Sequence, residues 1–343
     1  MSKEHAYVKA MRHDMAISPL LQSHILEFSN ALPFNRAMKL LRTAIPSAQV
    51  NASQAQRLVQ HFGKLEEMEQ LLRTPGFGIA ADAVDSEPAV FYAQVDGGHL
   101  LTDEGFRETK VGRLFAGHHI KQISSGDEEV NLRNSLEKSD YLAHMGYYED
   151  FINRFNPLID NHLKAHPEAK MVIVSDGADW IARWAARDYP DAMVILDFYH
   201  AAEKLCEFAK MVFNSEEKRH RWIENRKEEL LDGQIEKVVL AIRTKALGRR
   251  ATIMDKASDI IQYYNKNSYR MHYDEYLEAG YCIGSGAIES AISTVAQQRC
   301  KLVGQRWTQR VAAVLNLRAA FKSDKHKGIR QLINYQMGHQ WTA

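Results

Sequence analysis

Three acidic residues stand where expected secondary-structure elements end or begin. Asp96 follows the apolar run AVFYAQV, Asp176 follows the run MVIVS, and Glu289 lies in the first turn of an expected late helix. Carboxylate oxygens are the ligands that Mg²⁺ prefers, and Mg²⁺ keeps open positions for substrate phosphate. Two such ions, about 3.5–4 Å apart, activate an attacking oxygen and stabilise the leaving oxygen in a displacement at phosphorus. This chemistry requires the three carboxylates to converge on one end of a sheet.

The stretch from Met171 to Lys204 has the pattern that would position the second acid. Residues 171–175 and 193–196 are short apolar runs typical of buried strands. The residues between them have the apolar spacing of a helix, and Pro190 closes that helix. A β-α-β-α unit of this kind predicts two neighbouring parallel strands. Polar residues at the carboxyl ends of such strands often carry the chemistry of α/β proteins.

Asp176 and Asp197 directly follow these two strands, and His200 comes one turn into the next helix. His200 is a candidate for contact with a phosphate oxygen or with the active-site carboxylates, and Asp197 is a candidate supporting residue. The alternative interpretation is structural. Both aspartates would then serve only as helix N-caps, and His200 would bond to Asp197 or to the backbone.

An antiparallel arrangement is expected before this unit. Residues 89–96 and 99–102 predict two strands joined by a hairpin turn at Gly97-Gly98, and residues 110–120 predict a third. A long helix is expected over about 139–165. Together with the two parallel strands and the late helix, this order of elements is that of a ribonuclease H-like α/β domain.

Helical patterns without any strand pattern continue from residue 205 to residue 280. They predict a large all-α insertion that divides the ribonuclease H-like domain into residues 89–204 and 281–343. Trp222 in this insertion is a candidate for stacking on a DNA base. The competing interpretation is a tryptophan packed between helices.

The last part of the chain is locally basic. Four of its residues are candidates for contact with DNA phosphates: Arg299, Lys301, Arg306 and Arg310. A solvated basic face without a ligand is the alternative.

Residues 1–75 show helical patterns only and predict a small N-terminal domain. Helices are expected over 34–43, from a cap at Asn51 or Ser53 to Gly63, and over 66–73. Two short helices around a tight turn resemble a helix-turn-helix, whose second helix would present Arg57 to DNA. A plain helical hairpin packed on the next domain is the alternative. Residues 76–88 are expected to form a linker.

The composition excludes several classes of protein. The 343 residues carry a net charge of +1, so a DNA-binding surface would have to come from local clustering of basic residues. The three cysteines are far apart, which argues against a disulfide framework or a cysteine-based zinc site. No apolar run approaches the roughly 20 residues of a membrane span, and a signal peptide is not expected. We expect a cytoplasmic protein with no membrane partner.

Several segments resemble the DDE transposases of bacterial insertion sequences, in particular the ISKra group and its Mutator-like relatives. The segments are VDGG at 95–98, FRETKVGRLF at 106–115, SDGADWI at 175–181, ILDFYHAAEKL at 195–205, IGSGAIES at 283–290 and QRCKLVGQRWTQRVAAVLNLRAA at 298–320. Together they span most of residues 89–322. The resemblance of the N-terminal part is loose.

The resemblance implies that Asp96, Asp176 and Glu289 form a metal-binding triad for two Mg²⁺ ions, which Mn²⁺ would be able to replace. Asp197 and His200 match a D-x-x-H motif of these relatives, and a helical insertion before the glutamate is a family trait. The implied function is DNA strand cleavage and strand transfer of an insertion sequence. The implied partners are the element ends, target DNA and further copies of the chain in a homodimer or larger oligomer, associated with a bacterial nucleoid.

Two other functions stay open. One is a stand-alone ribonuclease H-like nuclease that cleaves without strand transfer. The other is a domesticated, transposase-derived protein that binds DNA without catalysis. The intact set of three acids argues against the second function.

Overall fold

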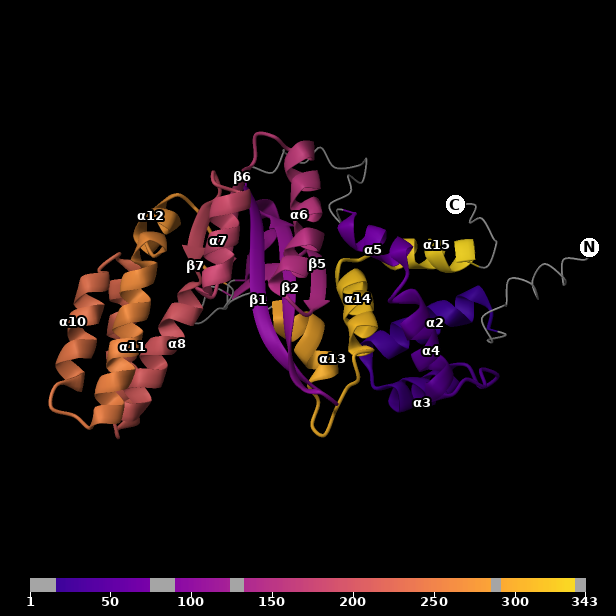
Figure 1. Ribbon diagram of the computed structural model, residues 1–343, viewed down its shortest axis with the longest axis horizontal. Coiled ribbons are helices and arrows are strands. Elements are labelled where there is room, and N and C mark those ends of the chain that lie inside the picture. The colour runs from indigo at the N-terminus through magenta and orange to yellow at the C-terminus, as the bar shows by residue number, and fades with distance from the viewer. Residues whose placement is uncertain (1–16, 75–89, 124–132, 285–290, 337–343) are drawn as a thin grey trace, which may run out of the picture. The chain divides into compact units, whose positions relative to one another are not determined.

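The computed structural model describes residues 17–74, 90–123, 133–284 and 291–336. It is a mixed α/β protein with a five-stranded sheet in the order β5-β2-β1-β6-β7 and a two-stranded sheet of β3 and β4 (Figure 1). The strands are β1 Val90–Thr102, β2 Gly105–Ala116, β3 Ile120–Ile123, β4 Arg133–Leu136, β5 Asp140–Met145, β6 Lys170–Ser175 and β7 Met193–Leu196.

Helices make up most of the remaining described residues. The α-helices are α2 Pro19–Ala31, α3 Phe34–Ala44, α4 Ala52–Phe62, α5 Glu66–Arg73, α6 Tyr148–Ala165, α7 Asp179–Asp188, α8 Phe198–Val212, α9 Glu216–Leu231, α10 Ile235–Ala246, α11 Ala251–Asn267, α12 Tyr273–Glu278, α13 Gln298–Cys300, α14 Val311–Lys322 and α15 His326–Gln336. Short turns of other helix types are η1 Gly117–His119, η2 Ser268–Arg270 and η3 Ser293–Gln297. None of these described helices has both the length and the apolar content needed to cross a membrane.

The chain divides into two compact units. The first comprises residues 1–120, 136–169 and 290–343, and the second comprises residues 121–135 and 170–289. The predicted linker at 76–88 lies outside the described residues.

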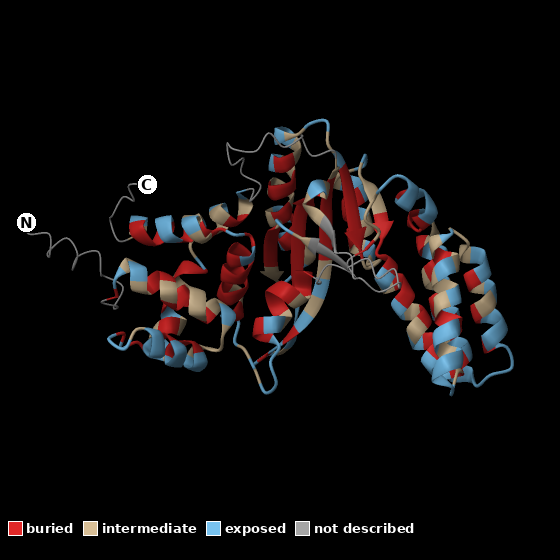
Figure 2. Cartoon of the chain, turned by 180° about the vertical axis from the view of Figure 1, so that it is seen from behind, coloured by how far each residue is buried: buried red, intermediate tan, exposed pale blue. Residues whose placement is uncertain are grey.

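In the first unit, the N-terminal helices begin at polar caps. Ser18 caps α2, and Asn51 forms a reciprocal capping box with Gln54 at the start of α4, which confirms one of the two predicted caps. The apolar faces of α2 to α5 share one hydrophobic core with α14 and α15. Figure 2 shows strands and the inward faces of helices as buried. The helices of the predicted N-terminal domain therefore pack on the last part of the chain.

Helix α14 is fixed to the N-terminal helices by polar contacts as well as apolar ones. Asn316 Nδ2 donates to the carbonyl of Gly63 at 2.7 Å, and Arg318 Nη1 donates to the carbonyl of Asn30 at 2.8 Å. Lys325, between α14 and α15, donates to the carbonyls of Leu71 and Leu72. Buried backbone carbonyls need hydrogen-bond donors. These contacts therefore fix the position of α14 and Lys325 against the N-terminal helices.

The antiparallel strands differ from the sequence-based prediction in two places. The predicted hairpin turn at Gly97-Gly98 is wrong, because β1 continues through both glycines to Thr102 and pairs with β2 along this whole length. Residues 140–145, predicted as the start of the long helix, form β5 instead, and the helix begins at Tyr148. Pairing with β2 accounts for this strand, since tertiary contacts override the weak local preferences of DYLAHM.

In the second unit, the predicted β-α-β-α arrangement is confirmed. Strands β6 and β7 are parallel, with Val172 opposite Met193 and Ser175 opposite Leu196, and α7 connects them. The predicted all-helical stretch is also confirmed: the described residues 205–280 form α8 to α12 and a short helical turn, with no strand among them. Helices α8, α9, α10 and α11 pack on one another in sequence order, and α11 packs back on α8.

Candidate active site

Asp96 lies half-buried in β1, directly opposite Val111 of β2. Alternate residues of a strand face the same side, so Asp96 shares a face of β1 with Gly98 and Leu100. Leu100 and Val111 belong to the core that includes Ile292. The first acid therefore stands on the face of β1 that the chain after residue 290 covers.

Gly98 allows this close approach. A Cβ atom at Gly98 would lie 2.8 Å from Cγ1 of Ile292, which is closer than real side chains come. Glu289 precedes Ile292 by three positions in the sequence and lies outside the described residues.

Asp176 directly follows β6, and its carboxylate folds back on the turn that begins there. Its Oδ1 accepts a hydrogen bond from the amide of Ala178 at 2.9 Å. Gly177 has φ of 96°, a conformation that residues with side chains rarely adopt. This turn carries Asp176 half-exposed at the carboxyl end of the strand.

The turn is held by residues from the distant helical insertion. The hydroxyl of Tyr263 in α11 donates to the backbone carbonyl of Asp176 at 3.0 Å. Arg270 Nη2 donates to the carbonyl of Gly177 at 3.1 Å. The pKa of Tyr263 is raised because the phenol is buried, and the charge of Asp176 raises it further. The Tyr263 hydroxyl therefore keeps its proton and acts as a donor.

Asp197 and His200 are brought together at the start of α8. Asp197 is buried, and its Oδ1 accepts from the amides of Tyr199 at 2.8 Å and His200 at 3.2 Å, so it is an N-cap, as the alternative interpretation of the sequence expected. His200 Nδ1 lies 3.6 Å from the same oxygen. The carboxylate thus both caps the helix and faces the imidazole.

Gly284 brings the loop before Glu289 against Asp197. The amide of Phe198 donates to the carbonyl of Ile283 at 2.9 Å. A Cβ atom at Gly284 would lie 2.9 Å from Asp197 Oδ1, so only glycine fits there without displacement. Ile283 and Gly284 therefore lie beside the end of β7.

Four of the six proposed DNA-binding residues are exposed, and all four belong to the first unit: Arg57, Lys301, Arg306 and Arg310. Gln60 Nε2 in α4 donates to the carbonyl of Arg310 at 2.7 Å, which places the 301–310 loop beside the helix that carries Arg57. Arg306 donates to the carbonyls of Thr102 and Asp103 in the β1–β2 turn.

The other two proposed DNA-binding residues are buried, which argues against the proposed DNA contact of Arg299 and agrees with the alternative interpretation of Trp222 as a tryptophan packed between helices. Arg299 is fully buried, with its guanidinium 5.1 Å from the ring centroid of Phe34 and 5.2 Å from that of Trp307. Its Nε donates to the carbonyl of Ser29 at 3.1 Å. Trp222 packs inside the insertion against Phe208 and Phe213, and only 7% of it is exposed. Neither side chain is available to DNA in this conformation.

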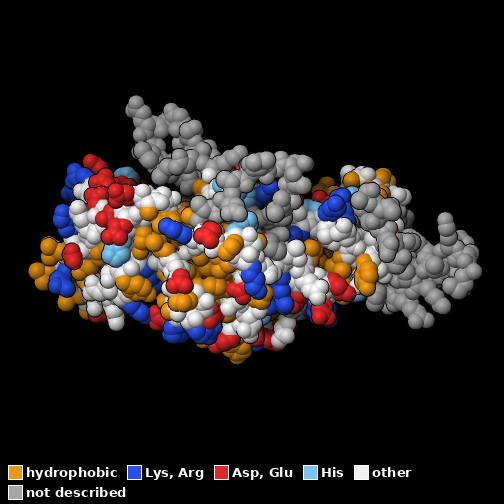
Figure 3. Space-filling model, turned by 90° about the horizontal axis from the view of Figure 1, so that it is seen from above, with side chains coloured by type: hydrophobic (Ala, Val, Ile, Leu, Met, Phe, Trp, Pro, Cys, Tyr) orange, Lys and Arg blue, Asp and Glu red, His pale blue; other side chains and the backbone are white. Residues whose placement is uncertain are grey.

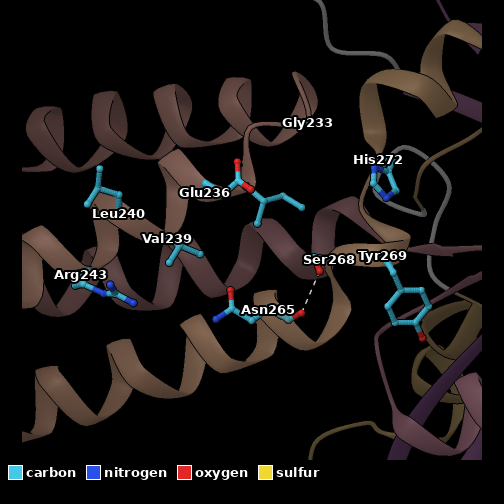
Figure 4. Close-up of a pocket in the computed structure, with 10 residues that line it drawn as sticks. Gly233, Glu236, Val239, Leu240, Arg243, Asn265, Ser268, Tyr269 and His272 are labelled. Carbon is cyan, nitrogen blue, oxygen red and sulfur yellow. Dashed lines mark hydrogen bonds between the residues drawn. The ribbon is translucent and has the colours of Figure 1, made fainter.

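A hollow of about 480 Å³ lies within the insertion, lined mainly by α10 and by the turn before α12, with Asn265 from α11. Figure 4 shows Glu236 and Val239 of α10 along it, with Tyr269 and His272 grouped at one end. In the view of Figure 3, a group of acidic side chains lies near the left edge, and basic, acidic and apolar side chains are mixed over the rest of the described surface.

Within the described residues, no group of three or more His, Cys, Asp or Glu side chains is arranged to hold a metal ion. Asp96 belongs to the first unit and Asp176 to the second. The donors themselves are carboxylates at half-exposed positions, and these suit a hard divalent cation such as Mg²⁺ rather than a soft metal.

Sequence reasoning missed the tyrosines of the insertion whose hydroxyls donate to backbone carbonyls of other elements. Besides Tyr263, the hydroxyl of Tyr264 donates to the carbonyl of Ala201 at 2.7 Å, and that of Tyr273 donates to the carbonyl of Leu196 at 3.0 Å. The only signal in the sequence is the frequency of tyrosine between residues 263 and 276.

These features define a mixed α/β protein in which a helical insertion supports the carboxyl ends of two parallel strands. The chain belongs to an uncharacterised protein family (UPF0236), whose model matches residues 81–333. A search of curated proteins finds no match to the chain.

Proposed function

We propose that this protein is a DDE transposase of a bacterial insertion sequence, related to the ISKra group, with a ribonuclease H-like catalytic domain. The observation that carries the proposal is the strand order. Numbered along the chain, the five strands of the main sheet stand in the order 3-2-1-4-5, with the second strand antiparallel to the first and third and with the last two parallel. This strand order supports a ribonuclease H-like domain. The proposed function itself is inferred from the acidic residues Asp96, Asp176 and Glu289, because a fold alone does not define a function.

In this proposal Asp96, Asp176 and Glu289 hold two Mg²⁺ ions, which Mn²⁺ is able to replace. The bound ions would supply charge neutralisation at the scissile phosphate and lower the pKa of the attacking oxygen. Asp96 stands half-exposed within β1, and Asp176 stands half-exposed in the turn that directly follows β6 and is held by Tyr263 and Arg270. Their carboxylates therefore present hard oxygen donors on a rigid support.

Asp197 and His200 have a supporting role in this proposal. The buried Asp197 carboxylate orients the His200 imidazole, whose side chain is 35% exposed. His200 is then placed to contact a phosphate oxygen of the DNA.

The exposed basic residues are proposed to contact the DNA backbone. Lys301, Arg306 and Arg310 lie in one loop, and Arg57 lies on the helix beside it. Phosphate contacts of this kind fix the position of DNA without reading its sequence. The active form is proposed to be a homodimer or a larger assembly on two element ends, acting in the cytoplasm at the nucleoid.

The test is metal-dependent cleavage of DNA that carries the ends of the source element. Wild type is compared with D96N, D176N and E289Q, and Asp255→Asn serves as the matched control because Asp255 is an exposed acid on α11. We expect each of the first three changes to lower cleavage at least about 100-fold while DNA binding persists, and D255N to cleave normally.

Other outcomes separate the alternatives. Cleavage that survives in D176N would contradict the proposal. Cleavage without strand transfer from a pre-cut end would indicate a stand-alone nuclease. DNA binding by wild type without cleavage in Mg²⁺ or Mn²⁺ would indicate a domesticated binding protein.

A further inference from the structure

Two side chains from the insertion reach the turn that carries Asp176. The Tyr263 hydroxyl and Arg270 Nη2 donate to the consecutive carbonyls of Asp176 and Gly177. The bonded residues are separated by 87 and 93 positions in the sequence. The insertion therefore contacts the backbone of this turn at two adjacent points.

The turn has little freedom to move away from these contacts. A Cβ atom at Gly177 would lie 3.0 Å from the Tyr263 hydroxyl oxygen and 2.9 Å from Cδ1 of Leu196. The side chains of α11 and β7 thus enclose the turn from two directions. Any residue larger than glycine would have to displace one of them.

Arg270 is itself held in place. It is fully buried, and both its Nε and its Nη2 donate to the side-chain oxygen of Asn267, at 3.1 and 2.5 Å. Asn267 Nδ2 in turn donates to the carbonyl of Tyr263 at 2.8 Å. Tyr263, Asn267 and Arg270 therefore form one connected polar group, whose donors point at the turn.

We propose that Tyr263 and Arg270 are positioning residues, which fix the direction of the Asp176 carboxylate by holding the backbone of the turn. The direction of the carboxylate depends on that backbone, because its Oδ1 accepts a hydrogen bond from the amide of Ala178 two residues on. The helical insertion is then a structural part of the catalytic centre. This proposal rests on the proposed function of Asp176 as a metal ligand.

Tyr264 provides a matched control. It is the next residue of the same helix, it is fully buried, and its hydroxyl also donates to one backbone carbonyl, that of Ala201 in α8. Tyr263→Phe and Tyr264→Phe each remove one hydroxyl and one hydrogen bond. Only the first removes a contact with the Asp176 turn.

The experiment uses the full-length protein and two readouts. The first is hydrogen exchange of the backbone amides of residues 175–180 without metal. The second is the dissociation constant for Mn²⁺ in wild type, D176N, Y263F and Y264F. We expect Y263F to speed exchange about fivefold and to weaken Mn²⁺ binding about tenfold, with Y264F close to wild type in both. Both variants should lose roughly 2–4 °C in melting temperature, since each loses one hydrogen bond, which is partly buried for Tyr263 and buried for Tyr264.

The outcomes distinguish the two proposals. If Y263F matches Y264F in exchange and in Mn²⁺ affinity, the positioning role is overturned and the metal site stands. If D176N binds Mn²⁺ as tightly as wild type, or wild type does not bind it, the proposed function of Asp176 fails. In that case the hydrogen-exchange rates of residues 175–180 in Y263F and Y264F show whether Tyr263 holds the turn, independently of any metal.

Discussion

Ile292 occupies the space that a side chain on Gly98 would need, with Cγ1 only 2.8 Å from the ideal Cβ position. Gly98 lies inside β1, five residues before the hairpin turn that follows at Asp103. Its role is therefore close packing within a strand rather than turn formation. The packing brings the chain that follows Glu289 in the sequence onto the face of β1 that carries Asp96.

Gly98→Ala should destabilise the protein, because the methyl group would collide with Ile292. We expect a loss of about 1–3 kcal/mol in the free energy of unfolding, measured by urea denaturation. Gly97→Ala is the control, since a Cβ at Gly97 would meet only Glu108 Oε1 at 3.9 Å. Equal effects of the two substitutions would contradict this packing role.

Asp197 offers a way to separate helix capping from catalysis. Asp197→Ala removes the oxygen that accepts from the amides of Tyr199 and His200, and should cost about 1 kcal/mol of unfolding free energy. Asp197→Asn keeps an acceptor oxygen and should retain most of that stability. If D197N also retains full DNA cleavage, the charge of Asp197 has no supporting role.

Lys325 is a buried cation whose loss should be costly. Its Nζ lies 3.3 Å from Asp140 Oδ1, and Asp140 is fully buried with its Oδ2 3.3 Å from His162 Nε2. Burial lowers the pKa of Lys325, and the charge of Asp140 opposes that shift. Lys325→Met would leave the Asp140 carboxylate without this partner and should reduce stability by about 3–5 kcal/mol.

The control for Lys325 is Lys327→Met, at an exposed position two residues on. Adding Asp140→Asn to K325M should restore part of the lost stability, because the uncompensated charge is then removed. Thermal or urea unfolding of K325M, K327M and the double variant K325M/D140N measures these changes in stability. A loss in K325M no larger than in K327M would show that the buried pair is unimportant.

Alkaline pH should destabilise the second unit. Burial raises the pKa of Tyr263, Tyr264 and Tyr273 above the usual value of 10.0. Below pH 10 the phenols are protonated in both states, so their contribution to stability is complete. Above pH 10 the unfolded tyrosines lose protons while the folded ones retain them, so stability falls as pH rises.

Absorbance at 295 nm during an alkaline titration measures this effect. Part of the tyrosinate signal should appear only with unfolding, followed in parallel by circular dichroism. The same titration in about 6 M urea should show ordinary tyrosine ionisation. If all tyrosines ionise near pH 10 in the folded protein, then the hydroxyls of Tyr263, Tyr264 and Tyr273 are not shielded from solvent as described.

Regular periodicity made parts of the fold predictable. The apolar runs at 171–175 and 193–196, with a helix between them, led directly to the parallel pair β6 and β7. Strand β5 was missed because its residues have no clear strand preference and depend on pairing with β2. The hairpin turn was predicted at the wrong place because Gly97-Gly98 has the local pattern of a turn. The structure instead requires glycine at position 98 because Ile292, which is distant in the sequence, packs against it.

The candidate site was predictable only in part, for a similar reason. Strand ends identify Asp176 and Asp197 from local pattern alone. Tyr263 has no such pattern, since its contact with Asp176 spans 87 positions. A charged residue type also does not show whether the side chain is exposed. Arg299 was expected at the surface, yet its guanidinium lies against the rings of Phe34 and Trp307.

The shared core of the first unit has a consequence for how the protein is made. Helices α2, α4 and α5 leave the ribosome early, but they pack on α14, which is the last but one of the described helices along the chain. The apolar surface that α14 covers on these helices stays exposed until residues 311–322 have been made, and exposed apolar surface of this kind favours aggregation. A copy truncated before Val311 would lack this cover.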